Sequence, residues 1–161
     1  MSEAGAAADT AGGEEEGSEQ LAPVRYCPVE IAAVEVLLPE SHARLVLCEI
    51  GGQRRAFTVP IGIPEANAIV YAREGLQTPR PLTHELFASS LAAYGIVLEA
   101  VRITAGEDRA FRAEVVFSGP SGPRTLDCRP SDGIALALRH PLPVPLTVTE
   151  AVLDQLGVAT G

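Results

Sequence analysis

The chain has 161 residues, of which 47% are apolar, and it carries a net charge of -9 at pH 7. This length supports one domain with a substantial core. No segment approaches the roughly 20 apolar residues of a membrane span, and the first residues lack the pattern of a signal peptide. We therefore expect a cytoplasmic protein with no membrane partner.

The three cysteines, Cys27, Cys48 and Cys128, are odd in number, lie far apart and form no C-x-x-C pair. This pattern fits a reducing compartment and argues against a structural zinc site.

The negative charge is concentrated at one end of the chain. Residues 1–20 hold six acidic residues and no basic one, so the remaining residues carry only -3. Residues 1–22 have no apolar periodicity, and we expect them to form a disordered acidic tail ahead of a folded domain at residues 28–157. That domain lacks the basic surface needed to hold nucleic acid through charge alone, although a small catalytic site remains compatible with it.

The first half of the domain predicts a meander followed by helices. Alternating apolar and polar residues indicate strands at residues 29–38, 42–50 and 54–61. Gly51-Gly52 predicts the tight turn between the second and third strands. Pro64 then begins a predicted helix at residues 65–73, and after a loop Thr83 is a favourable N-cap for a second helix that ends at Tyr94.

The second half predicts a second set of strands and two shorter helices. The strands are expected at residues 96–103, 110–117 and 124–128, and the helices at residues 131–139 and 149–156. The order is β-β-β-α-α-β-β-β-α-α. We therefore expect a single α+β domain, a largely antiparallel or mixed β-sheet with about four helices packed on it.

The stretch from Asp127 to Arg139 is the most informative part of the chain. Its helix is apolar on almost all sides and should be buried. Ser131 or Asp132 could accept hydrogen bonds from the free amides of its first turn. The turn also gathers carboxylates, a guanidinium and helix amides, which could hold an anion or a metal. The alternative is an N-cap with ion pairs that close off a buried helix.

Common nucleotide and hydrolase motifs are missing. The sequence has no G-x-G-x-x-G, P-loop, G-x-S-x-G or H-E-x-x-H pattern. No nucleotide or organic cofactor is therefore expected.

Two stretches together resemble a known family. They are Arg80-Pro-Leu-Thr-His-Glu-Leu86 and Arg129-Pro-Ser-Asp-Gly-Ile-Ala-Leu-Ala-Leu-Arg139. With the helix start at Glu65-Ala66, they look like the bifunctional nuclease domain over about residues 28–157. The resemblance implies a nuclease that acts on DNA, RNA or both.

The resemblance also implies a set of site residues. Its polar motif positions fall on Glu65, Arg80, Thr83, His84, Glu85, Asp127, Arg129, Ser131 and Asp132. This chain departs from the usual pattern at two places, with Glu85 where the family usually has aspartate and Gly133 where it usually has alanine.

Phosphodiester hydrolysis gives these residues roles in our first hypothesis. Catalysis is assigned to Glu65, His84, Asp127 and Asp132, and substrate binding to Arg80, Arg129 and Ser131. Mg²⁺ or Mn²⁺ would be held by Glu65, Glu85, Asp127 and Asp132. Nucleic acid would be a transient substrate, and a homo-oligomer is a possible state.

The second hypothesis is a non-catalytic regulatory or assembly module. In it, Arg80 and Arg129 bridge Asp127, Asp132 and Glu85 in a structural polar network between helices. The irregular spacing of these residues means that only the fold can decide which of them meet.

Overall fold

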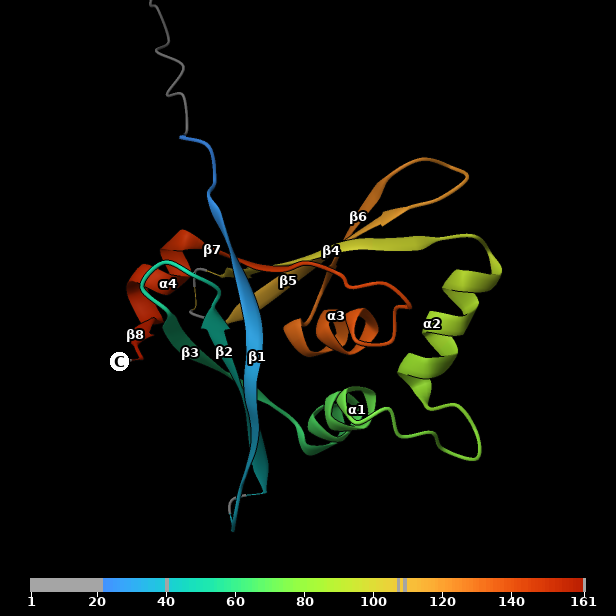
Figure 1. The fold of residues 1–161 in the computed structure, drawn as a ribbon, viewed down its shortest axis with the longest axis horizontal. Coiled ribbons are helices and arrows are strands. Elements are labelled where there is room, and N and C mark those ends of the chain that lie inside the picture. The colour runs from blue at the N-terminus through green and yellow to red at the C-terminus, as the bar shows by residue number, and fades with distance from the viewer. Residues whose placement is uncertain (1–21, 40, 107, 109, 161) are drawn as a thin grey trace, which may run out of the picture.

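A computed structural model describes residues 22–39, 41–106, 108 and 110–160. Nearly all of the predicted disordered tail, residues 1–22, lies outside these residues. Within them the chain forms the single α+β domain that the sequence predicts (Figure 1). The strands are β1 Tyr26–Leu37, β2 His42–Glu49, β3 Arg55–Ile61, β4 Val97–Ala105, β5 Phe111–Ser118, β6 Arg124–Cys128, β7 Leu146–Thr149 and β8 Val158–Ala159. The helices are α1 Ile63–Arg73, α2 Thr83–Ala93, α3 Pro130–Ala137 and α4 Glu150–Leu156.

The strands form one mixed sheet in the order β6-β5-β4-β7-β1-β2-β3-β8. β4 and β7 are parallel, and the other neighbours that pair are antiparallel. The predicted order of strands and helices is confirmed. The short strands β7 and β8 were not predicted from the sequence.

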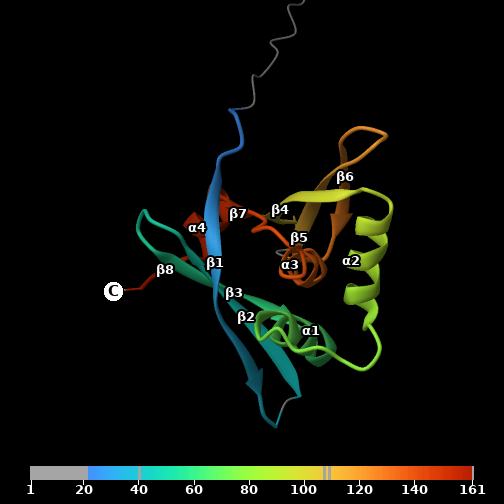
Figure 2. The same ribbon diagram turned by 45° about the vertical axis from the view of Figure 1, so that its right-hand side comes forward.

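The long strand β1 joins the two halves of the sheet. Tyr26, Cys27 and Pro28 pair with β7, while the rest of β1 from Val29 onwards pairs with β2. α1 packs on β1 and β2, α3 packs on β4 and β5, and the two helices contact each other. Figures 1 and 2 show both helices held between the two halves, with α2 outside them and α4 next to β3 and β7. The helices α1 and α3, which begin near the predicted site, therefore lie between the two halves of the sheet.

The helix α3 forms the centre of the core, as predicted. Its buried residues are Pro130, Ser131, Gly133, Ile134, Ala135, Leu136 and Ala137. The predicted side-chain cap is wrong, because the N-cap is Arg129 and neither Ser131 nor Asp132 caps the first turn. The Asp132 carboxylate is instead bound by Arg129 and His84.

The start of α2 also differs from the prediction. Its N-cap is Leu82 rather than Thr83, because the carboxylate of Glu85 accepts a hydrogen bond from the Leu82 N–H at 2.9 Å. A glutamate at the third helical position that reaches back to the N-cap amide replaces the expected threonine cap.

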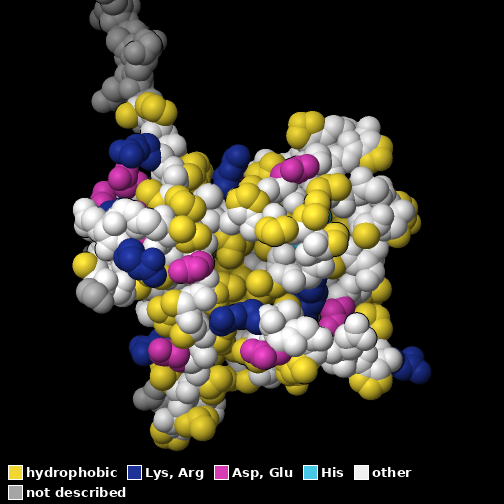
Figure 3. Space-filling model, viewed as in Figure 1, with side chains coloured by type: hydrophobic (Ala, Val, Ile, Leu, Met, Phe, Trp, Pro, Cys, Tyr) yellow, Lys and Arg dark blue, Asp and Glu magenta, His cyan; other side chains and the backbone are white. Residues whose placement is uncertain are grey.

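The surface agrees with the charge argument. In the face shown in Figure 3, acidic and basic side chains are interspersed among apolar ones, and no broad basic patch is present. None of the described helices has the length and apolar character needed to cross a bilayer.

Candidate functional site

The first turns of α1 and α3 meet at one guanidinium, and the first turn of α2 joins them through Asp132. Arg129, the N-cap of α3, donates from Nη1 to Glu65 Oε1 at 2.8 Å. It also donates from Nε and Nη2 to the two oxygens of Asp132, at 2.8 and 2.9 Å. His84 Nε2 lies 3.1 Å from Asp132 Oδ1. These four residues are called the Arg129 cluster below.

Each member of the cluster lies at or just before the start of a helix. Glu65, His84 and Asp132 belong to the first turns of α1, α2 and α3. The free amides and the dipole at a helix N-terminus favour negative charge. Three such ends at one point favour both the two carboxylates and the binding of an additional anion.

The sequence explains why Glu65 occupies its position. Gly62 caps α1, and Pro64 lies in the first helical turn, where its missing N–H costs nothing. A Cβ on Gly62 would overlap Oε2 of Glu65. A side chain at residue 62 would therefore shift the carboxylate, so Gly62 favours this position of Glu65, which the sequence did not reveal.

The cluster keeps Asp132 ionised. Burial opposes ionisation, but hydrogen bonds from Arg129 and His84 outweigh it and lower the pKa of Asp132. The carboxylates of Asp132 and Glu65 in turn raise the pKa of Arg129. Because an ionised carboxylate only accepts hydrogen bonds, His84 Nε2 carries a proton and Nδ1 is the nitrogen left for chemistry.

A cavity of about 450 Å³ borders the cluster. Glu65, Arg129 and Ser131 supply its polar wall. Its apolar wall comes from the end of β3 and the start of β5, and includes Ile61 and Phe111. Phe111 was not identified as a site residue from the sequence, because nothing in the spacing connects β5 with α1.

The structure does not bring Asp127 into the cluster. Its side chain is 64% exposed and pairs with Arg112 of β5 at 3.2 Å. Side chains alternate along a strand, and Cys128, the next residue of β6, is on the face that meets α3 near Gly133. Asp127 therefore points to the opposite face of the sheet. On β5 every second residue, Ala113, Val115 and Phe117, is buried. This alternation was the sequence signal that could have placed Asp127 on the opposite, exposed face of the sheet.

Glu85 and Arg80 also lie outside the cluster. The Glu85 carboxylate binds the Leu82 N–H and the Thr78 hydroxyl, and these contacts lower its pKa. It also lies 3.7 Å from Nη2 of Arg139. Arg80 is in the exposed loop before α2, where its carbonyl accepts a hydrogen bond from Thr78. Neither side chain is hydrogen-bonded to a member of the Arg129 cluster.

The four predicted metal ligands do not converge on one point. Glu65 and Asp132 share Arg129, Glu85 caps α2, and Asp127 lies on the other face of the sheet. Among the residues that the structure describes, no group of three His, Cys, Asp or Glu is arranged to hold an ion. The described side chains, as they lie, therefore do not fit Mg²⁺ or Mn²⁺.

Comparison with known proteins gives two findings. A family model described as the bifunctional nuclease domain matches residues 45–161. Two uncharacterized proteins of Mycobacterium tuberculosis, from strains CDC 1551 / Oshkosh and H37Rv, are each 38% identical to this chain over 130 residues. Each match covers 81% of this chain and 76% of the relative.

Proposed function

Because the chain belongs to the bifunctional nuclease domain family, we propose that it cleaves phosphodiester bonds of nucleic acid at the Arg129 cluster. The observation that supports this site is one exposed guanidinium that binds carboxylates from the first turns of α1 and α3, one of which also binds His84 of α2. The Arg129 side chain is 64% exposed although three of its N–H groups are already bound. A guanidinium carries five N–H groups, so two remain to bind a phosphate.

The cluster supplies the groups that phosphodiester cleavage requires. The charge that develops on the phosphate oxygens would be stabilised by Arg129 and the nearby helix amides. Glu65 and His84 provide a carboxylate and an imidazole for proton transfer. Asp132 orients the imidazole of His84, since its carboxylate accepts a hydrogen bond from Nε2.

The alternative of a non-catalytic module has support at a different arginine. Arg139 has a side chain only 8% exposed and joins α1, α2 and α3 through Ala68, Glu85 and Ala135. This network differs from the one predicted for the alternative, in which Arg80 and Arg129 bridge Asp127, Asp132 and Glu85. Arg129, in contrast, faces solvent and a cavity, which favours a role in binding substrate.

The test is cleavage of labelled single-stranded DNA and RNA by purified protein, with and without divalent metal. We expect the wild-type protein to cleave at least one substrate. Arg129→Gln should lose about 100-fold in rate, the effect of removing one donor that stabilises developing charge.

Arg112→Gln is the matched control. Arg112 is 62% exposed and ion-paired with a carboxylate, as Arg129 is, but it lies on β5 outside the cluster. Its variant should cleave at the wild-type rate, and thermal denaturation should show both variants folded. No cleavage by the wild-type protein, or equal cleavage by Arg129→Gln, would overturn the proposal.

A further inference from the structure

Another pocket, of about 540 Å³, lies between α2, the start of β4 and the end of α3. Although α2 is rich in apolar residues, none of them is fully buried. Its side chain Leu91 lines the pocket together with Ile96, Leu98 and Leu136. Concave and mostly apolar spaces of this size, with few polar groups, are typical of small-molecule sites. This space is called the α2 pocket below.

The α2 pocket is separate from the site described above. Its lining residues include no member of the Arg129 cluster and none that lines the cavity beside that cluster. A ligand of the α2 pocket would therefore not compete directly with a substrate bound at Arg129.

The wall of the α2 pocket contains a buried guanidinium that lacks acceptors. The Arg139 side chain lines the pocket and is only 8% exposed. Its Nη1 donates to the carbonyl oxygens of Ala68 and Ala135. Its Nε and Nη2 have no hydrogen-bond partner among the described residues. Because unpaired buried donors of a charged group are costly, we expect an acceptor from outside the chain at these two nitrogens.

A carboxylate of the chain lies near these nitrogens but does not pair with them. Oε1 of Glu85 is 3.7 Å from Nη2 of Arg139, which is too far for a hydrogen bond. Oε2 of Glu85 accepts from the Leu82 N–H and the Thr78 hydroxyl, at 2.9 and 3.2 Å. Glu85 is therefore held at the start of α2, and Nε and Nη2 of Arg139 remain unpaired.

We propose that the α2 pocket binds a small organic monocarboxylate with an apolar body. Nε and Nη2 lie on one edge of the guanidinium, so their two parallel N–H groups match the two oxygens of a carboxylate. The apolar body of the ligand then lies against the side chains of α2 and β4 and is removed from water. This binding site is independent of the proposed nuclease function.

The surroundings of Arg139 favour a carboxylate over a phosphate. One edge of a guanidinium satisfies both oxygens of a carboxylate, whereas a phosphate has further oxygens that would lie unpaired among apolar side chains. Hydrogen bonds lower the pKa of Glu85, so this neighbour is ionised at neutral pH. Its charge repels the second negative charge of a phosphate monoester. A singly charged ligand therefore fits the pocket best.

The experiment titrates the isotope-labelled full-length protein with octanoate and follows its amide signals by NMR. We expect saturable shifts of signals from residues 88–98 and 136–141, and none from residues 59–65 or 129–131. Octan-1-ol has the same chain without the carboxylate and should bind about 10-fold more weakly or worse, because it cannot pair with the guanidinium. Octyl phosphate should also bind more weakly. Equal or tighter binding of either compound would overturn the assignment of a carboxylate.

A pair of alanine variants tests the place of binding. Ala92→Phe should fill the pocket, since Ala92 lines it from an exposed position of α2. Ala93→Phe is the matched control, because Ala93 is the next exposed residue of the same helix and does not line the pocket. Octanoate should bind Ala92→Phe about 10-fold more weakly or worse, a loss of about 1.4 kcal/mol or more. It should bind Ala93→Phe as it binds the wild type.

Two arginine variants test the recognition of the carboxylate. Arg139→Lys keeps the charge but loses the planar edge, and octanoate should bind it about 10-fold more weakly. Arg129→Gln should bind octanoate as the wild type does, since that guanidinium is outside the pocket. If Arg139→Lys does not fold, Ala92→Phe decides the outcome, because it leaves Arg139 in place.

Three results would overturn the inference. The first is octanoate binding to Ala92→Phe with wild-type affinity, and the second is a set of shifts confined to signals near Arg129. The third is the absence of any saturable shift, which would mean that water satisfies the buried guanidinium. None of these results bears on nucleic-acid cleavage, which is measured separately and assigned to the Arg129 cluster.

Discussion

Two arginines that flank α3 have opposite environments. Arg129 precedes the helix with a side chain that is 64% exposed, whereas the Arg139 side chain is 8% exposed. The Nη1 of Arg139 donates to the carbonyl oxygens of Ala68 and Ala135, at 3.0 and 3.1 Å. These carbonyls belong to α1 and α3, so Arg139 joins the two helices while Arg129 faces the cavity. Two residues of the same type in one motif therefore have different environments, and under the proposed function only the exposed one binds substrate.

Substitution of each arginine by lysine should separate these roles. Lysine keeps the charge but cannot make the planar, bidentate contacts of a guanidinium. Arg129→Lys should slow cleavage by about 100-fold with a melting temperature close to wild type. Arg139→Lys should lower the free energy of unfolding by about 1–3 kcal/mol, because buried carbonyls lose their donors. Cleavage rates and denaturant unfolding of both variants check this, and the reverse assignment of effects would contradict it.

The contact between α3 and the sheet depends on a residue without a side chain. A Cβ on Gly133 would lie 2.9 Å from Val101 Cγ1 and 3.3 Å from Val115 Cγ1. Both valines are in the core, on β4 and β5. Gly133 therefore lets α3 approach the sheet closely. The distance between helix and sheet also determines where Arg129 and Asp132 lie relative to Glu65 and His84.

Gly133→Ala should destabilise the protein even though alanine favours helices. The gain in helix propensity is at most about 1 kcal/mol, while an overpacked core typically costs 1–3 kcal/mol. We expect a net loss of about 1 kcal/mol by chemical denaturation. In the double variant with Val101→Ala the cost of adding the methyl group should vanish, because the contact is removed. A Gly133→Ala protein more stable than wild type would show that the helix can shift away from the sheet.

The helices and long strands could be predicted because their patterns are local. Alternation identified β1 to β6, and the proline and glycine signals located the starts of α1 and α3 to within two residues. β7 has only four residues and follows a proline-rich stretch, so its own sequence does not indicate a strand. It is stabilised by distant partners, β1 on one side and β4 on the other.

The site could be predicted only in part, because its geometry also depends on contacts between distant parts of the chain. The family resemblance pointed to Glu65, His84, Arg129 and Asp132, but their meeting depends on how α1, α2 and α3 pack. Asp127 was expected with them because it is close in sequence to Arg129. The two-residue period of β6 turns it to the opposite face, and proximity along a strand does not overcome that alternation.

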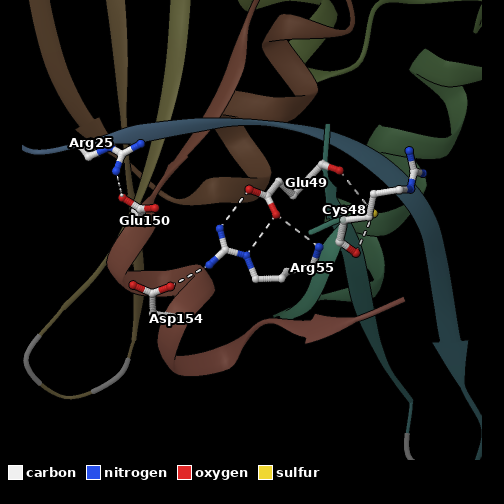
Figure 4. Close-up of polar contacts among 7 residues, drawn as sticks. Arg25, Cys48, Glu49, Arg55, Glu150 and Asp154 are labelled. Atoms are coloured by element: carbon white, nitrogen blue, oxygen red, sulfur yellow. Dashed lines mark hydrogen bonds and ion pairs between the residues drawn. The ribbon is translucent and has the colours of Figure 1, made fainter. Parts of the chain in front are cut away.

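At the scale of the whole molecule, the last two elements, α4 and β8, contact the meander of β1, β2 and β3. β8 pairs with β3, and α4 packs against β3 and β7. Figure 4 shows Arg55 of β3 between Glu49 of β2 and Asp154 of α4. Arg55 binds the two oxygens of Glu49 at 2.9 and 3.0 Å and Asp154 Oδ1 at 2.6 Å. The side chains of Arg55 and Glu49 are only 12% and 7% exposed, so this contact is shielded from solvent.

This network should make folding stability depend on pH in the acid range. Hydrogen bonding from Arg55 lowers the pKa of Glu49 from its ordinary value of 4.5. A carboxylate whose pKa is lower in the folded state stabilises that state above its unfolded-state pKa, and the contribution is lost as the pH falls through the folded-state value. The free energy of unfolding should therefore fall as the pH drops below about 4.5. Glu49→Gln should be less stable at neutral pH and should lose less stability over the same range.

The matched control is Glu30→Gln, which changes an exposed carboxylate 3.8 Å from Arg54. Both side chains of that pair are more than half exposed, so it should contribute little and leave the pH dependence close to wild type. Denaturant unfolding of the three proteins between neutral and acid pH gives the comparison. Parallel curves for wild type and Glu49→Gln would mean that Arg55 holds α4 and the meander together without help from the Glu49 charge. A flatter curve for Glu49→Gln would identify this contact as an acid-sensitive link between the two ends of the fold, independent of the Arg129 cluster.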